Sequence, residues 1–200
     1  MKRLASAVLM VVTVIGFIAV SSVSATASPG PKDQLKATTD QVLGMLQNKQ
    51  LAEEEKARRV REAIRPRFDF DEMSKRVLAT HYRANANRMN EFVPLFTELL
   101  EKLYFSKVLM AEGASVIYLS EKVDGNMADV RTKITFAKGD DAEVSYRMHL
   151  VNGEWKIYDI MAGGISLVGN YRSQFNTIIR RSSFDQLLKD IRDTVDGKKK

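Results

Sequence analysis

A strand-like alternation is clearest in the segment DVRTKITFA, residues 129–137, and it recurs in EVSYRMHL, residues 143–150. One face of the first segment carries Val130, Thr132, Ile134 and Phe136, and one face of the second carries Val144, Tyr146, Met148 and Leu150. Mostly charged and polar residues alternate with them. This period of two predicts antiparallel strands with one buried face and one solvated face.

Two further strands are expected on either side of this pair, at residues 115–120 and 155–161. Turn residues at Asp124-Gly125, at 138–140 and at Asn152-Gly153 separate the four segments, which favours an antiparallel meander. The glycine pair at 163–164 is interpreted as a bulge in the fourth strand, and an extension of that strand to Val168 stays open.

Apolar residues at helical spacing precede and follow the strands. Helices are expected around residues 35–46, at 53–65 as a charged surface helix that Pro66 stops, at 73–78, and at 92–104 as a long core helix. A last helix begins near Asn170 and continues weakly toward Val195. This order predicts an α+β fold with helices packed on a curved four-stranded antiparallel sheet. A curved sheet facing helices makes a cone. This cone either closes on a solid core or opens around an apolar cavity, and periodicity does not decide between these two possibilities.

The start of the chain has the pattern of an export signal. Lys2 and Arg3 precede an almost unbroken apolar run over residues 4–20, and Ala25-Thr26-Ala27 offers a cleavage site. A retained membrane anchor is the alternative, but a run of about 17 residues is short for a span of roughly 20. We therefore expect a cleaved signal peptide at 1–27, one domain at 28–200 with a basic tail at 198–200, and a periplasmic protein. Because the chain has no cysteine, neither disulfides nor a lipid-modified cysteine can form.

The formal charge of +6 falls to +4 once Lys2 and Arg3 are removed. An exported protein rarely meets nucleic acid, so anionic membrane surfaces and acidic proteins are the expected partners, with plain solubility as the alternative. The densest basic stretch consists of Arg58, Arg59, Arg61, Arg65 and Arg67. It either pairs with glutamates 53–55 and 62 on a solvated helix face or serves as a docking surface.

Few residues suggest chemistry. His81 and His149 lie in different predicted elements and the chain has no cysteine, so we expect neither a metal site nor a catalytic one. Asp69 followed by Glu72 reads as a helix start. Asp159, inside an apolar strand, is the strongest candidate for a buried, reactive carboxylate. The nine methionines and nine phenylalanines are enough for a core, or for the lining of an adaptable cavity.

Three stretches near the C-terminus carry a family resemblance: WKIYDI at 155–160, GISLV at 164–168 and NYRSQF at 170–175, supported by FDF at 68–70. Together they resemble the periplasmic phospholipid carriers of the Mla lipid-transport pathway, the MlaC-like proteins also described as toluene-tolerance or ABC-transporter auxiliary proteins. The sequence departs from that family at Ala79 and Tyr82, where glycine and tryptophan are usual, and at Gly163, where an acidic residue is common.

The resemblance implies an NTF2-like or cystatin-like cone whose apolar cavity holds acyl tails while the headgroup stays near solvent. It also implies a carrier without a cofactor or enzymatic activity. Its partners would be an outer-membrane lipoprotein complex, an inner-membrane ABC transporter assembly and, transiently, the membrane surface. Two tails contain roughly 30 methylene groups, so exposing them to water would cost on the order of 20 kcal/mol. A cavity near about 1,000 Å³ is therefore expected.

The residues expected to line this cavity are assigned by strand or helix face and by the resemblance. They are Tyr104, Val108, Val116, Tyr118, Val130, Ile134, Phe136, Tyr146, Met148, Ile157, Val168, Tyr171 and Phe175. Three alternatives remain: a carrier of another apolar ligand such as a hopanoid, sterol or quinone-like lipid; an enzyme on the same fold that uses Asp159, Tyr158 or His81; and a scaffold with a filled core.

Overall fold

The computed structural model describes residues 28–137 and 141–198. The expected signal peptide at 1–27, the turn at 138–140 and the last two lysines lie outside these residues. The helices are α1 (Pro31–Gln47), α2 (Glu53–Ile64), α3 (Phe70–Leu78), α4 (Met89–Leu109), α5 (Leu167–Arg181) and α6 (Phe184–Val195), with short 3₁₀ turns η1 (Arg65–Arg67), η2 (Ala79–His81) and η3 (Arg83–Arg88). The strands are β1 (Ser115–Asp124), β2 (Met127–Thr135), β3 (Asp141–Val151), β4 (Glu154–Ala162) and β5 (Ile165–Ser166).

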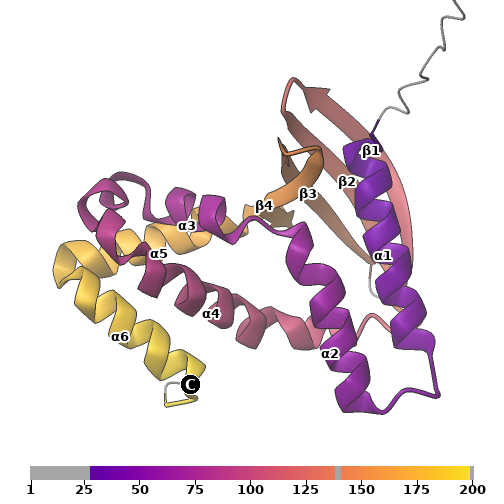
Figure 1. Cartoon of the computed structure of the whole chain (residues 1–200), viewed down its shortest axis with the longest axis horizontal. Helices are drawn as coiled ribbons and strands as arrows, with labels where there is room; N and C mark the ends of the chain where they lie inside the picture. The colour runs from indigo at the N-terminus through magenta and orange to yellow at the C-terminus, as the bar shows by residue number, and fades with distance from the viewer. Residues whose placement is uncertain (1–27, 138–140, 199–200) are drawn as a thin grey trace, which may run out of the picture.

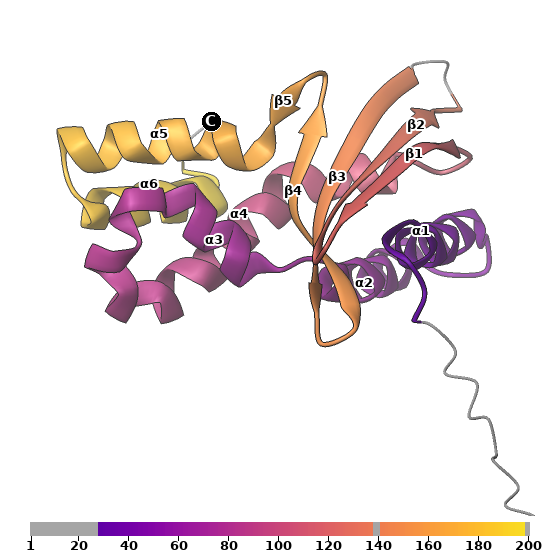
Figure 2. The same cartoon turned by 90° about the horizontal axis from the view of Figure 1, so that it is seen from above.

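The strands form one curved antiparallel sheet in the order β1-β2-β3-β4-β5, so the predicted meander is confirmed (Figures 1 and 2). Asn152 and Gly153 have φ of 51° and 83°, the left-handed values that a two-residue hairpin requires. Val130 pairs with Tyr146 across β2 and β3, which places the two predicted apolar faces on the same side.

Two local predictions near the C-terminus are wrong. Gly163 and Gly164, with φ of 56° and 78°, form a turn that reverses the chain into β5, so the sheet has a short fifth strand where a bulge was expected. The last helix starts at Leu167 and is two helices, because Ser183 caps the N-terminus of α6 by accepting a hydrogen bond from the Gln186 backbone.

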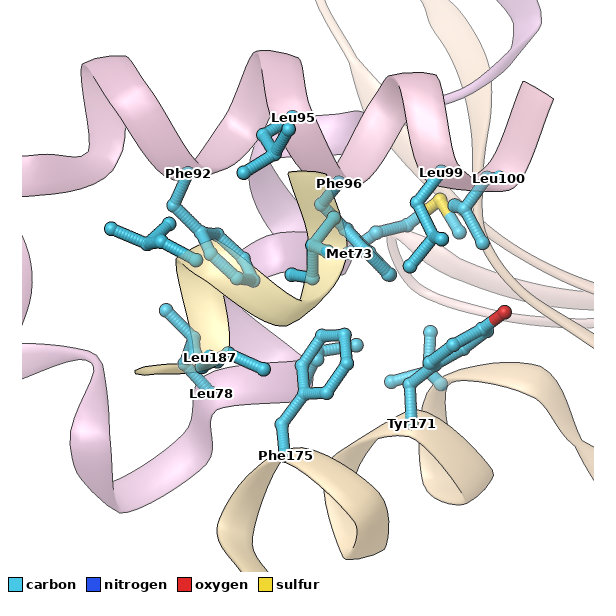
Figure 3. Close-up of a cluster of buried hydrophobic side chains, with 14 of the residues drawn as sticks. Met73, Leu78, Phe92, Leu95, Phe96, Leu99, Leu100, Tyr171, Phe175 and Leu187 are labelled. Atoms are coloured by element: carbon cyan, nitrogen blue, oxygen red, sulfur yellow. The ribbon is translucent and has the colours of Figure 1, made fainter. Parts of the chain in front are cut away.

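The helices divide into two groups. Helix α1 lies along the sheet, where Leu35 packs with Val130, Met148 and Ile157, and α2 packs on α1 through the fully buried Val60. Helices α3 to α6 bury one another beside the sheet instead of covering it (Figures 1 and 2). Aromatic rings from α4 and α5 fill this second core (Figure 3). The α+β class is confirmed, with a helical core that the sequence analysis did not separate from the sheet.

Helix α4 belongs to both halves of the molecule. Its N-terminal part contributes Phe92 and Phe96 to the helical core, and its C-terminal part reaches toward α1 and α2 (Figure 1). Within residues 28–137 and 141–198, no helix combines the length and apolar character needed to cross a membrane.

Candidate functional site

Two adjoining cavities lie around the C-terminal part of α4. The sheet chamber, of about 350 Å³, is enclosed by α1, α4 and the inner face of strands β1 to β4. The helix chamber, of about 580 Å³, is lined by α2, η1, α3, α4, strands β4 and β5 and the start of α5. Both are lined by Ile64, Phe68, Tyr104, Lys107, Val108 and Ile160. The shared walls make the chambers neighbouring parts of one site.

The sheet chamber has walls that are mainly apolar, with Thr38, Thr39, Arg67 and Lys107 as its polar lining residues. Its sheet side consists of Val116, Ile134, Phe136, Val144, Tyr146, Ile157 and Ile160, and α1 adds Leu35, Val42 and Leu43. Burial raises the pKa of Tyr146 to about 12, because the phenolate would lose its hydration in this surrounding. The chamber is therefore suited to hydrocarbon.

The helix chamber combines an apolar interior with a charged rim. Phe70, Met73, Leu100 and Leu167 form part of the interior, and Arg61, Arg65, Glu101, Lys107 and Asn170 supply the polar groups. Ile165, on the short strand β5, also lines the chamber although it is 66% exposed. A ligand with an apolar body and a charged end matches this distribution.

A strap at residues 68–70 connects the two halves of the molecule beside both chambers. The rings of Phe68 and Phe70 stack 5.7 Å apart. Between them, the Asp69 carboxylate accepts a hydrogen bond of 2.8 Å from the Glu72 backbone and lies 2.9 Å from His149 Nε2, while the Asp69 amide donates to the Ile157 carbonyl. The prediction that Asp69 caps a helix is confirmed, and the cap also ties α3 to the sheet.

Seven of the thirteen residues expected to line the cavity do line one or both chambers: Tyr104, Val108, Val116, Ile134, Phe136, Tyr146 and Ile157. Their contact with a ligand stays a prediction. The other six lie elsewhere: Val130 and Met148 are closed into the sheet core, Tyr118 packs against that core, and Val168, Tyr171 and Phe175 belong to the helical core. All six pack in or against these cores and are absent from the lining of both chambers.

Apart from Tyr104 and Val108 on α4, the sequence analysis missed the contribution of the helical elements to the site. Arg61, Ile64 and Arg65 come from α2 and η1, Phe70 and Met73 from α3, and Phe105 from α4. Alternation along a strand predicts which residues face the interior. For a helix, the sequence does not predict which other element packs against a given face. Among these residues, the FDF strap was the one signal in the sequence that could have indicated the site.

The candidates for catalysis have structural partners. Asp159 is 3% exposed, and its carboxylate accepts hydrogen bonds from the Val168 amide at 3.0 Å, Ser166 Oγ at 2.6 Å and Arg147 at 3.3 Å. His81 Nε2 lies 2.9 Å from the Asn176 side chain. Among the residues described, no group of three or more histidine, aspartate or glutamate side chains is arranged to hold a metal ion.

Replacing Asp159 with alanine is expected to lower the free energy of unfolding by about 3 kcal/mol, because the buried Val168 amide at the start of α5 loses its acceptor. Urea denaturation followed by circular dichroism measures this. Asp124→Ala, which removes an exposed carboxylate from the same sheet, should change stability by less than about 0.5 kcal/mol. Equal stability of the two variants would show that Asp159 does not anchor α5.

The arginine-rich stretch divides by partner. Arg58 pairs with Glu55 and Glu62 at 2.7 Å, and Arg59 pairs with Glu55 at 2.6 Å. These contacts lower the pKa of Glu55 to about 2. Arg58 and Arg59 therefore fit the alternative in which the arginines pair with glutamates on a solvated helix face. Arg61 and Arg65 instead point toward α4 and the helix chamber.

The fold and the site define the class: an α+β protein that encloses an apolar space between a curved antiparallel sheet and its helices. The family described as MlaC protein matches residues 36–193, which is most of the chain. The chain belongs to the MlaC family.

Individual proteins agree with this assignment. The chain is 26% identical over 178 residues to the toluene tolerance protein ttg2D of Pseudomonas putida, covering 86% of this chain and 80% of that protein. It is also 26% identical over 135 residues to the intermembrane phospholipid transport system binding protein MlaC of Haemophilus influenzae, covering 64% of this chain and 63% of that protein.

A solved structure shares the fold. It is a phospholipid-binding protein from Ralstonia solanacearum in complex with a phospholipid, with a TM-score of 0.75 and 21% sequence identity, and the match covers 84% of this chain and 98% of that one.

Proposed function

We propose that this protein binds a phospholipid with its acyl tails in the sheet and helix chambers and its headgroup at the charged rim, and that it carries the lipid between membranes. The observation that carries the proposal is the pair of adjoining apolar chambers. Membership of the MlaC family supports it, as do the names of the relatives from Haemophilus influenzae and Ralstonia solanacearum, which refer to phospholipid transport and phospholipid binding.

The size of the site is consistent with two tails. Volumes of about 580 and 350 Å³ together approach the upper end of ordinary ligand pockets, about 1,000 Å³. Enclosing roughly 30 methylene groups offsets a hydration cost on the order of 20 kcal/mol. A soluble carrier needs such an enclosure, because a lipid free in water would rejoin the nearest bilayer.

The proposal extends to a periplasmic route. The export signal expected at residues 1–27 and the resemblance to Mla carriers support exchange between an inner-membrane ABC transporter assembly and an outer-membrane lipoprotein complex, with transient membrane contact. The proposal includes a carrier and not an enzyme. Of the candidates for acid or base, Asp159 and His81 form hydrogen bonds to helix α5, and Tyr158 is buried in the helical core, which supports structural roles for all three.

The test is identification of the lipid that co-purifies with the protein. Mass spectrometry of protein purified from the periplasm without detergent is expected to find about one phospholipid per chain. A delipidated sample should regain phospholipid from vesicles and deliver it to acceptor vesicles. Recovery of a hopanoid, sterol or quinone in place of phospholipid would support the alternative carrier, and an empty protein that takes up no lipid would contradict both.

A further inference from the structure

The rim of the helix chamber carries an excess of positive charge. Its charged lining residues are Arg61 from α2, Arg65 from η1, and Glu101 and Lys107 from α4. The rim therefore carries three cations and one carboxylate. The remaining walls of the chamber are mainly apolar. The positive charge is therefore concentrated at the rim, where a bound ligand would meet solvent.

The four side chains are engaged to different degrees. Arg61 is held in place, since its Nε lies 3.3 Å from Glu101 and its guanidinium stacks 4.4 Å from the centre of the Phe105 ring. Arg65 reaches the same carboxylate only at 3.9 Å and is 59% exposed. Lys107 lies 5.5 Å from the centre of the Tyr104 ring, and within the described part of the chain it forms no ion pair. Arg65 and Lys107 thus keep donors available for another acceptor.

Neighbouring arginines show that this is a local property. Arg58 and Arg59, on the same helix, are neutralised by Glu55 and Glu62 of that helix. The rim arginines face a single glutamate from α4 instead. The excess charge is therefore specific to the side of α2 that borders the chamber.

We propose that Arg65 and Lys107, with Arg61 and Glu101 positioning the arginine pair, form a subsite for the phosphate of a lipid headgroup with net negative charge. The proposal rests on the proposed function, which places the tails in the chambers below. A guanidinium fork and an ammonium are suited to phosphate oxygens. A zwitterionic headgroup brings its own cation to the rim, where the same positive charges repel it, whereas phosphatidylglycerol does not.

The expected preference is moderate because the rim is partly exposed. Each such charge contact changes the equilibrium constant for lipid binding by a factor of about two to five. Delipidated protein equilibrated with vesicles of equal phosphatidylglycerol and phosphatidylcholine should therefore bind phosphatidylglycerol with about five- to tenfold enrichment, as measured by mass spectrometry of the bound lipid. Raising the salt concentration should reduce the enrichment.

The double variant Arg65→Gln/Lys107→Gln should lose the enrichment, measured as the ratio of phosphatidylglycerol to phosphatidylcholine in the bound lipid. Its matched control is Arg58→Gln/Lys102→Gln, which also removes one arginine and one lysine, from α2 and α4, at positions that line neither chamber. The control should retain the preference of the unmodified protein. Circular dichroism checks that both variants are folded.

In the lipid experiment, the subsite is overturned by no preference in the unmodified protein, by a preference that survives Arg65→Gln/Lys107→Gln, or by an equal loss in the control. Inorganic phosphate, tested alone by calorimetry, separates a headgroup site from a free-anion site. Tight phosphate binding that the rim variant abolishes would assign the cations to a free anion and overturn the headgroup proposal. Failure of the proposed function is distinct, because then no variant binds lipid of either kind.

Discussion

A lysine in place of Ile134 is expected to leave the protein folded and to reduce its bound phospholipid more than tenfold. Ile134 is half-buried and lines the sheet chamber, so a lysine ammonium there faces the space that an acyl tail would occupy. In the empty protein the side chain can extend toward water, whereas a tail would enclose an unpaired charge. Lipid content per folded protein, measured by mass spectrometry after detergent-free purification, tests this.

Met148 provides the comparison. It lies on the same face of the sheet but is 0% exposed and packs with Val130, Trp155 and Ile157. A lysine there has no route to water, and an unpaired buried charge costs about 3–5 kcal/mol. Met148→Lys should therefore unfold the protein or shift its urea midpoint strongly. If Ile134→Lys unfolds in the same way, the sheet chamber is a packed core; if it keeps its full lipid, the tails lie elsewhere.

Replacing Phe96 with alanine is expected to lower the free energy of unfolding by about 3–5 kcal/mol. Phe96 is 0% exposed, and its ring lies 5.6 Å from Phe92, 5.6 Å from Tyr171 and 5.7 Å from Phe175 (Figure 3). Truncation leaves a cavity among rings that cannot close it without moving α4 or α5. The urea midpoint measures the effect.

The control for Phe96→Ala is Leu103→Ala. Leu103 lies on the same helix and is 41% exposed, so its truncation should cost less than about 1 kcal/mol. Phe96 lines neither chamber, and the folded fraction of Phe96→Ala should therefore retain phospholipid. A loss of lipid from the folded variant would show that the helical core and the chambers are coupled.

The strands were the predictable part of the site. Val116, Ile134, Phe136 and Tyr146 were assigned to a cavity by their strand face and by the family resemblance, and all four line the sheet chamber. The same reasoning included Met148, which lies on the same face two residues from Tyr146 but is buried in the sheet core and lines neither chamber. Alternation reports which side of a sheet a residue is on, but it does not report whether a helix has closed over that residue.

The sequence predicted where the helices occur but not which elements they pack against. Tyr171 and Phe175 have the spacing of a core-facing stripe, and the sequence analysis directed that stripe into the cavity. It packs against α4 instead, because the turn at Gly163-Gly164 and the Asp159 anchor fix where α5 leaves the sheet. The sequence showed that Arg61 and Arg65 belong to a basic stretch. Their position at the helix chamber depends on how α2 crosses α4.

The sequence by itself determined the α+β order, the antiparallel meander and the apolar inner face, because these follow from local periodicity and turn residues. The family also followed from the sequence, since its most particular motifs lie in continuous stretches such as residues 155–160. Only the tertiary structure decided that apolar surface from both halves of the molecule surrounds two chambers instead of meeting as one filled core. That outcome depends on distances between elements far apart in the chain, and packing between α4, α2 and the sheet sets those distances.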